Sequence, residues 1–361
     1  MRALAVDLPN SLEQGFGKGL ELAVPHDERP PRLYAIGMGS SAIAADLARG
    51  IVEPETAWPL SVVRAPTLPR SVDPGAHAIF VSYSGNTWET IHAYEAAGRA
   101  GARRTVIASG GTLAERAEAD GVPVLRIPPG IPARMAVGHL LGGILGLLDS
   151  AFPESNEGRM ARVAQRVRSQ IGAYARPTGP AGALAERIGD RLPFVCAETG
   201  FLALARHWKS QIETNAKRLA AIDEAPELFH NALAGWDALR RSEAARYAVV
   251  LLEWSGSDPA VARGFRHFER QLAARSVRVV RVPLLADDPL EALVGGIALG
   301  DFTSLFLASQ LRVDPYPVEA VGRLKVVLDP PALPDRPPDD RATSPGVRLR
   351  APAAVARVQR H

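Results

Sequence analysis

The sequence predicts a doubly wound α/β fold that occurs twice within one chain. Three observations support this prediction. Short β-branched runs alternate with Ala/Leu/Arg-rich stretches of helical period, the runs are apolar on both faces as in buried parallel strands, and the pattern of the first half returns in the second. We therefore expect two three-layer α/β/α domains with doubly wound parallel sheets, related by internal duplication.

The first half alternates strand and helix. Strands are expected over residues 32–37, 60–64, 77–84, 103–109 and 122–127. Helices are expected over residues 40–52, 87–101 and 112–121, where apolar residues recur at helical spacing. A buried helix over residues 136–152 follows, and the sequence "PESNEG" then breaks the pattern. The first domain is accordingly expected over residues 1–152.

The second half repeats the pattern in a weaker form. Strands are expected over residues 192–200, 246–256 and 277–283, and helices over 201–219 and 258–276. The sequence "HAIFVSYSGN" of the first half resembles "YAVVLLEWSGS" of the second, and only the first keeps a full set of hydroxyls. The second domain is expected over residues 153–330. Residues 331–361 are rich in proline and charge, so we expect a mobile tail.

Composition and charge exclude several classes of function. Apolar residues make up 47% and charged residues 22%, and the net charge of +3 is too small to indicate a nucleic-acid or membrane surface. The first residues carry Asp7 and Pro9 where a signal peptide would be apolar. The single cysteine, Cys196, lies in an apolar run and is expected to be a core thiol rather than a nucleophile. The expected location is the cytoplasm.

The stretch "SYSGNT" at the end of an expected strand points to an anion site. Ser82 and Ser84 lie two residues apart, so on an extended segment both hydroxyls would point to one side. Gly85 allows a tight turn, and Thr87 would begin the next helix, where free amides and the helix dipole favour an anion. One hydroxyl alone would indicate plain helix capping. Three hydroxyls and a glycine favour phosphate binding.

A second loop of the same kind lies at "GMGSS". Gly39 leaves the backbone bare, while Ser40 and Ser41 add hydroxyls at a helix start. Residues 37–42 also match the glycine spacing of dinucleotide-binding folds, but the next strand ends in Arg64 where that fold requires an acid. No Gly-Lys-Ser/Thr of a P-loop follows either. The two loops are therefore expected to close around one phosphomonoester rather than a nucleotide.

These motifs resemble those of the sugar isomerase (SIS) domain proteins. "GMGSS", "SYSGNT" and "QIETNAKRLAAIDEAPELFHNALAGW" are similar to the bifunctional phosphoglucose/phosphomannose isomerases within that family, as are "PARMAVGHLL" and "VDPYPVEAVGRLK". The resemblance covers residues 10–328. It implies two SIS domains per chain, a homodimer with a shared active site, and neither metal nor cofactor. It places the substrate phosphate on Gly39, Ser40, Ser41, Ser82, Ser84 and Thr87.

The implied reaction is aldose–ketose isomerisation of glucose 6-phosphate, and of mannose 6-phosphate, to fructose 6-phosphate through an enediol. It requires a base, a donor that opens the sugar ring and a positive group near the enediolate. By the resemblance, His230 assists ring opening across the dimer, Lys325 lies at the same end, and Arg134 stabilises the developing negative charge.

The base position departs from the family pattern. The family reads Gln-x-Asn-Glu-Asn-x-Lys with the glutamate as base, whereas this chain has Thr214 at that place and Glu213 one residue earlier. One step along a helix turns a side chain by about 100°. Two hypotheses follow. The protein is an isomerase with Glu213 as a displaced base, or it binds sugar phosphates with weak or lost catalysis.

Overall fold

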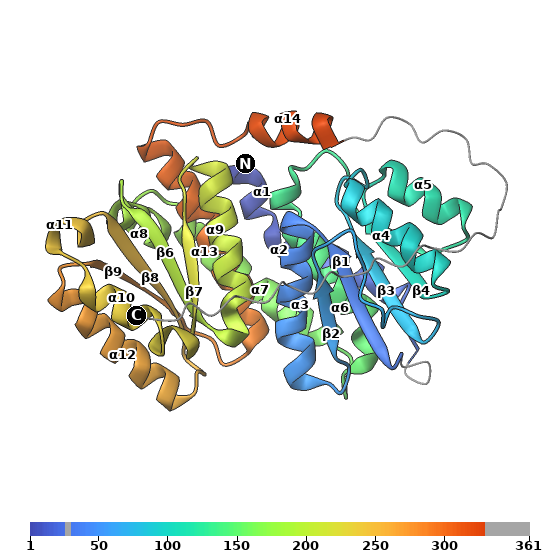
Figure 1. Ribbon diagram of the computed structural model, residues 1–361, viewed down its shortest axis with the longest axis horizontal. Coiled ribbons are helices and arrows are strands. Elements are labelled where there is room, and N and C mark those ends of the chain that lie inside the picture. Colours follow the sequence, from blue (N-terminus) through green and yellow to red (C-terminus); the bar gives the residue numbers. More distant parts are fainter. Residues whose placement is uncertain (26–29, 329–361) are drawn as a thin grey trace, which may run out of the picture.

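Two parallel β-sheets organise the chain (Figure 1). The computed structural model describes residues 1–25 and 30–328, and of Lys325 and Val326 only the backbone; the predicted tail over residues 331–361 lies outside the described residues. The first sheet has the order β2-β1-β3-β4-β5. Its strands are β1 (Arg32–Gly37), β2 (Leu60–Val63), β3 (Ala76–Val81), β4 (Arg103–Ala108) and β5 (Val124–Arg126).

The second sheet repeats this order as β7-β6-β8-β9. Its strands are β6 (Leu192–Glu198), β7 (Ala221–Ala225), β8 (Tyr247–Trp254) and β9 (Arg278–Leu284). In each sheet the first strand in sequence pairs with the second on one side and the third on the other, and all of these pairings are parallel. The predicted doubly wound α/β fold with an internal duplication is confirmed.

Helices connect the strands and cover both faces of each sheet. In the first half they are α1 (Arg2–Val6), α2 (Leu8–Leu20), α3 (Gly39–Glu55), α4 (Trp88–Arg99), α5 (Gly111–Ala119), α6 (Val137–Leu147) and the 3₁₀ turns η2 (Ala133–Met135) and η3 (Asp149–Ala151). The remaining elements are α7 (Glu157–Tyr174), α8 (Pro180–Ile188), η4 (Thr199–Phe201), α9 (Leu202–Asn215), η5 (Glu227–Phe229), α10 (Ala232–Ala238), α11 (Arg241–Ala244), α12 (Pro259–Ala274), α13 (Pro289–Gln310) and α14 (Glu319–Leu328).

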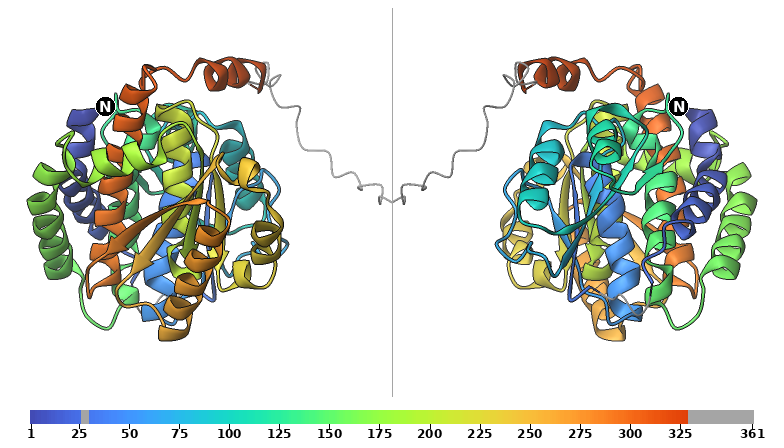
Figure 2. Two further views of the ribbon diagram at one scale, coloured as in Figure 1. Left: turned by 90° about the vertical axis from the view of Figure 1, so that its left-hand side faces the viewer. Right: turned by 90° about the vertical axis from the view of Figure 1, so that its right-hand side faces the viewer.

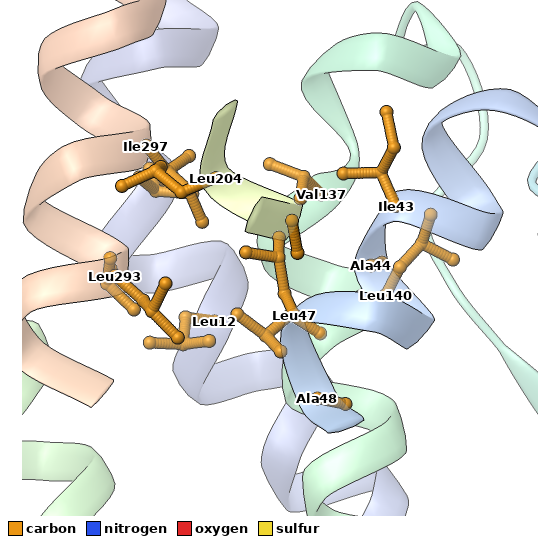
Figure 3. Packing of buried hydrophobic residues seen from close by; sticks show 14 of the residues in the cluster. Leu12, Ile43, Ala44, Leu47, Ala48, Val137, Leu140, Leu204, Leu293 and Ile297 are labelled. Carbon is orange, nitrogen blue, oxygen red and sulfur yellow. The ribbon is translucent and has the colours of Figure 1, made fainter. Parts of the chain in front are cut away.

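The largest apolar cluster lies between the two sheets and joins both halves. Figure 3 shows side chains of α2, α3, α6, α9 and α13 that meet there, among them Leu12, Leu47 and Leu204. A second cluster packs α4 and α5 on the outer face of the first sheet, and a third packs α10 and α12 on the outer face of the second. Figure 2 shows the two ends of this layered arrangement. The predicted domain boundary after residue 152 stays a prediction.

The buried helix expected over residues 136–152 is α6 followed by η3. It packs closely against α2, and glycines make this approach possible. A Cβ atom at Gly142 would overlap the Leu12 carbonyl, and one at Gly146 would overlap the carbonyl of Phe16. Among the described residues, one helix, α13, is long and apolar enough to cross a bilayer. Of its most apolar 18-residue segment, 78% is buried inside the fold.

Two predictions in the second half were wrong. The helix expected to reach residue 219 ends at Asn215, because Lys217 takes a left-handed conformation (φ 54°) that ends an α-helix. Residues 221–225, over which no strand was expected, form the edge strand β7. Its sequence "AIDEA" carries two acids and is only partly buried, so it lacks the continuous apolar run that identified the other strands.

Candidate active site

The first hydroxyl loop is a turn at the carboxyl edge of the first sheet. β3 ends at Val81, and the Gly85 amide donates to the Ser82 carbonyl at 3.0 Å, so the two serines lie on a turn and not on the extended segment that the sequence suggested. The Ser82 hydroxyl is buried and donates to Thr87 Oγ1 at 3.1 Å. Ser84 Oγ accepts from the Asn86 amide at 3.2 Å. Ser84 and Thr87 are partly exposed.

Thr87 begins α4, but its side chain does not cap the helix. Thr87 occupies the N-cap position without a side-chain hydrogen bond to the first-turn amides, because its hydroxyl is turned toward Ser82. Plain helix capping was the alternative to phosphate binding for this residue, and the geometry does not favour it. The positive end of α4 is left without a capping side chain of its own, which suits an external anion.

A neighbouring loop holds the serine turn in place. Gly85 has a φ of 65°, and a Cβ atom there would overlap the Gly110 carbonyl. Ser109 donates from its amide (2.9 Å) and its hydroxyl (2.6 Å) to the Tyr83 carbonyl. The Thr112 amide donates to Asn86 Oδ1 at 3.0 Å. These contacts fix the backbone of the turn at a point where a larger residue would not fit.

The second hydroxyl loop adjoins the first. α3 begins at Gly39, which has a φ of 53°, and Ser40 is partly exposed beside it. Ser41 is buried, and its Oγ accepts from the Tyr83 amide at 3.2 Å. Ser41 therefore joins the two loops, and the residues left accessible for a ligand are Gly39, Ser40, Ser84 and Thr87.

Tyr83 also brings Arg134 to this edge of the sheet. Its hydroxyl donates to the Pro128 carbonyl at 3.1 Å and accepts from the Ile131 amide at 2.7 Å. Arg134 follows three residues later in η2, which packs against α3. The segment that leads into Arg134 is thus tied to Tyr83, between the two serines of the first hydroxyl loop.

Arg134 is 7% exposed and held by several hydrogen bonds. Nε donates to Asn215 Oδ1 at 2.8 Å, and Nη2 donates to the carbonyls of Pro315 (2.7 Å) and Tyr316 (2.9 Å). Burial lowers the pKa of Arg134 from its usual value. Nη1 has no acceptor among the described residues and is not among the fully buried atoms without a partner, so it keeps access to solvent. One edge of a fixed guanidinium is therefore available to a ligand.

Glu213 and Thr214 lie on the last turn of α9, next to the Asn215 that holds Arg134. Glu213 Oε2 accepts from Lys209 Nζ at 2.7 Å, and Oε1 accepts from the Ala220 amide at 3.4 Å. The Thr214 hydroxyl donates back to the Ser210 carbonyl at 2.6 Å. The side chain at the family's base position is thus occupied within its own helix, and the adjacent carboxylate is partly exposed at 28%.

Lys217 is a cation of this region that sequence reasoning missed. Its Nζ donates to the Thr214 carbonyl at 2.5 Å. Burial and the positive charge of Arg134 lower its pKa, while Asp314 acts in the opposite direction. Lys217 lies two residues after Asn215, which binds Arg134 Nε. Its position within the family motif was visible in the sequence and was the signal that could have identified it.

His230 lies far from Arg134 within one chain. α9 returns from the carboxyl end of β6 to the amino end of β7, so Asn215 lies at the amino edge of the second sheet, whereas His230 follows β7 at the carboxyl edge. The five residues of β7 span about 16 Å at roughly 3.3 Å per residue. His230 is exposed, and Figure 1 shows α10, which follows it, away from α14. Lys325 lies on α14, and its side chain is outside the described residues.

Cys196 belongs to the apolar cluster on the outer face of the second sheet. Cys196 is completely buried, and burial together with the nearby Asp223 raises the pKa of its thiol far above the usual range. Within the part of the chain that the structure describes, no group of three or more His, Cys, Asp or Glu side chains is placed to hold a metal ion. Cys196 is therefore a core residue, as the sequence indicated.

Comparisons with known proteins agree with these motifs. Residues 177–328 match the family described as the bacterial phospho-glucose isomerase C-terminal SIS domain. A bifunctional phosphoglucose/phosphomannose isomerase from Caldicellulosiruptor bescii is 29% identical over 88% of this chain and 96% of its own length. One from Aquifex aeolicus is 28% identical, over 81% and 88% respectively. The solved tagatose-6-phosphate ketose/aldose isomerase from Escherichia coli superposes with a TM-score of 0.67 at 15% identity, covering 86% of this chain and 93% of that one, which shows the shared fold.

Proposed function

Because the chain belongs to the SIS-domain family of the bifunctional phosphoglucose/phosphomannose isomerase type, we propose that it interconverts glucose 6-phosphate and mannose 6-phosphate with fructose 6-phosphate. The observation that carries the proposal is that the two hydroxyl loops are joined to each other and to the segment that leads into Arg134. Ser41 joins the loops, and Tyr83, in the first of them, accepts from the Ile131 amide just before η2. The named relatives favour an enzyme over a binding protein that has lost catalysis.

The phosphate would bind between the starts of α3 and α4. Ser40, Ser84 and Thr87 supply accessible hydroxyls, Gly39 allows close approach of the backbone, and the two helix starts supply amides and positive dipole ends. Ser41 would act from behind by joining the two loops, and Ser82 by holding the Thr87 hydroxyl. This arrangement binds a phosphomonoester without a lysine.

The isomerisation moves one proton between C1 and C2 of the open-chain sugar. Arg134 Nη1 would stabilise the negative charge that develops on the enediolate oxygens, because a fixed cation in a largely buried position costs no reorganisation during the reaction. Glu213 is the proposed base. It is the carboxylate on the turn of α9 that holds Arg134 through Asn215, and it must leave its contact with Lys209 to reach the sugar.

The proposed dimer places His230 in the partner's site. His230 is exposed and separated from Arg134 by the length of β7, so within one chain the two cannot act on the same sugar. Across a dimer, His230 of one chain would assist ring opening at the other chain's Arg134, and Lys325 on α14 would serve the same step. Pro315 and Tyr316, which Arg134 holds, lead directly into α14. A cytoplasmic location stays a prediction.

A coupled assay for fructose 6-phosphate formation tests the proposal. We expect turnover with glucose 6-phosphate and mannose 6-phosphate and, since a positioned base contributes about 10²–10⁴-fold, a loss of at least 100-fold in Glu213→Gln. Thr214→Val, which removes the neighbouring hydroxyl, is the matched control and should retain activity. If Glu213→Gln is silent, Glu213 is not the base; if the wild type gives no product from either sugar, the proposed reaction is wrong.

The shared site has a separate test. His230→Ala and Lys325→Ala homodimers should each be slow. Mixing the two variants should restore part of the activity if each site combines the two residues from different chains. A monomer at micromolar concentration by light scattering contradicts the dimer, and so does full activity in His230→Ala.

A further inference from the structure

A continuous chain of buried polar side chains runs from the middle of α13 to Arg134. Asp301 Oδ1 accepts from His207 Nε2 and from Gln211 Nε2, both at 2.7 Å. Asn215 Nδ2 donates to Gln211 Oε1 at 2.9 Å, and Asn215 Oδ1 accepts from Arg134 Nε at 2.8 Å. All of these residues are buried, and the carboxyl of Asp301 is completely enclosed. A buried network of this kind is stable only when each member finds a partner.

We propose that this relay, Asp301–Gln211–Asn215, positions the Arg134 guanidinium for its ligand. The proposal rests on the role of Arg134 in the proposed function and deepens it. The three residues do not face the ligand edge of Arg134 themselves; they act through it, so they are positioning residues.

The direction of the relay is fixed at its first step by acceptors. The two hydrogens of Gln211 Nε2 meet two oxygens that accept, Asp301 Oδ1 at 2.7 Å and the Arg134 carbonyl at 2.9 Å. The amide of Gln211 cannot turn over without setting its own oxygen against both of them. Its Oε1 is therefore held toward Asn215.

The second step is fixed in the same way. Asn215 Nδ2 donates to Gln211 Oε1 and, at 2.9 Å, to Ser304 Oγ. Ser304 has already committed its own hydrogen to the Asp301 carbonyl at 2.7 Å, so its oxygen accepts from Asn215. Both hydrogens of the Asn215 amide are thus used, and its Oδ1 is left for Arg134 Nε. The hydrogen bonds that Gln211 makes to Asp301 and to the Arg134 carbonyl therefore determine that the oxygen of the Asn215 amide, and not its nitrogen, faces Arg134 Nε.

The relay holds Arg134 at its backbone and its side chain together. Gln211 binds the Arg134 carbonyl, Asn215 binds Nε, and the carbonyls of Pro315 and Tyr316 bind Nη2. A planar guanidinium with Nε and Nη2 fixed has one orientation, in which Nη1 remains for a ligand. A misplacement of about 1 Å at such a group costs on the order of 100-fold in rate, so the positioning has a measurable consequence.

Crystal structures of variants test the positioning independently of activity. Gln211→Met keeps the length of the side chain and removes its hydrogen bonds. We expect Arg134 Nε to leave the 2.8 Å contact with Asn215 and the guanidinium to turn. Thr303→Val is the matched control, because Thr303 is a buried residue on α13, the helix of Asp301, whose hydroxyl donates to the Leu299 carbonyl and takes no part in the relay. An unmoved guanidinium in Gln211→Met overturns the inference.

A double-mutant cycle tests the functional consequence. Gln211→Met should lower kcat at least ten-fold with KM within two-fold, while the same change in an Arg134→Met background should cost less than two-fold, because the relay acts only through Arg134. Thr303→Val should lower Tm and leave kcat unchanged. Ser304→Ala, a milder change, should lower kcat two- to three-fold and serves if Gln211→Met does not fold.

The outcomes separate the two proposals. An equal loss of kcat in both backgrounds means that the network is merely structural and overturns the inference. Full activity in Arg134→Met removes the role of Arg134 from the proposed function and with it the purpose of the relay. Absence of wild-type turnover contradicts the isomerase proposal alone, and the crystal structures then decide the positioning.

Discussion

The loop after β3 and the loop after β8 occupy the same place in the two copies of the sheet, but they leave the following helix in opposite states. In the first copy the Thr87 hydroxyl turns to Ser82, and α4 begins without a capping side chain. In the second copy the Asp258 carboxylate accepts from the Ala260 amide at 2.6 Å and caps α12. The start of α4 is open to an external anion, whereas the start of α12 is capped by the protein's own carboxylate, Asp258.

The loop after β8 lies beside a further acid. Ser257 donates to Glu198 Oε1 at 2.7 Å, and Glu198 lies at the end of β6, the counterpart of β1. Burial and the charge of Asp258 raise the pKa of Glu198, while the Ser257 hydrogen bond lowers it. Two carboxylates thus lie where a phosphate would have to bind. The two copies thus share one topology, and a few side chains at the strand ends determine which copy can bind an anion.

We expect the largest effect from a substitution that gives the loop after β3 the capping carboxylate of the loop after β8. Thr87→Asp should cap α4 and stabilise the free protein by about 1 kcal/mol. It should also weaken fructose 6-phosphate binding by roughly 100-fold or more, because like charges in contact cost several kcal/mol. Calorimetry and thermal unfolding measure the two effects. Tighter binding in Thr87→Asp would show that this helix start is not the anion site.

Gly85→Ala should break the turn itself. The Cβ atom would overlap the Gly110 carbonyl at a φ of 65°, and a backbone carbonyl held in a turn cannot easily move aside. We expect a loss of about 2 kcal/mol in the free energy of unfolding, measured by urea titration. Gly256→Ala, its counterpart, meets the Trp254 ring, a side chain that can shift, and should cost less. Equal costs would mean that the two turns are under the same constraint.

Ser84→Ala should weaken fructose 6-phosphate binding about ten-fold, the value of one charge-assisted hydrogen bond of about 1.5 kcal/mol. Ser255→Ala removes the corresponding hydroxyl of the second copy and should leave binding unchanged, since that hydroxyl donates to the Ala286 carbonyl at 3.0 Å. Calorimetric titration of both variants provides the comparison. A loss in Ser255→Ala as large as that in Ser84→Ala would place a ligand in the second copy as well.

Glu198→Gln should give the smallest effect, seen in the pH dependence of stability. A carboxyl whose pKa is raised by folding favours the folded state while it is protonated, and that contribution is lost as pH rises from the ordinary value of 4.5 through the folded pKa. The variant should therefore unfold at a higher Tm than wild type at pH 7, and the difference should disappear below pH 4.5. A Tm difference that does not vary with pH would contradict the assigned cause.

Much of the fold was predictable because buried parallel strands leave an unmistakable apolar run. The edge strand β7 was missed because its partly exposed sequence holds two adjacent acids and no continuous apolar run. The end of α9 was missed because a left-handed Lys217 has no signal comparable to glycine. The serine loops were visible as hydroxyls after strands. That Ser41 faces inward depends on its contact with Tyr83, 42 residues further along the chain, which no local pattern records.

The buried relay was also beyond local reasoning. Gln211 and Asn215 belong to a motif that was recognised, but their partners Asp301 and Ser304 lie about 90 residues further along the chain on α13. The spacing of Gln211 and Asn215 predicts only that they share a helix face. Their function in holding Arg134 becomes apparent when three segments of the chain are brought together.

The most direct test of the central claim is the rate of fructose 6-phosphate formation from glucose 6-phosphate, measured side by side for wild type, Thr87→Asp and Asp258→Thr. We expect turnover in wild type, turnover within two-fold of it in folded Asp258→Thr, and a loss of about 100-fold or more in kcat/KM for Thr87→Asp. No turnover in wild type, or equal rates in Thr87→Asp and wild type, would contradict the claim.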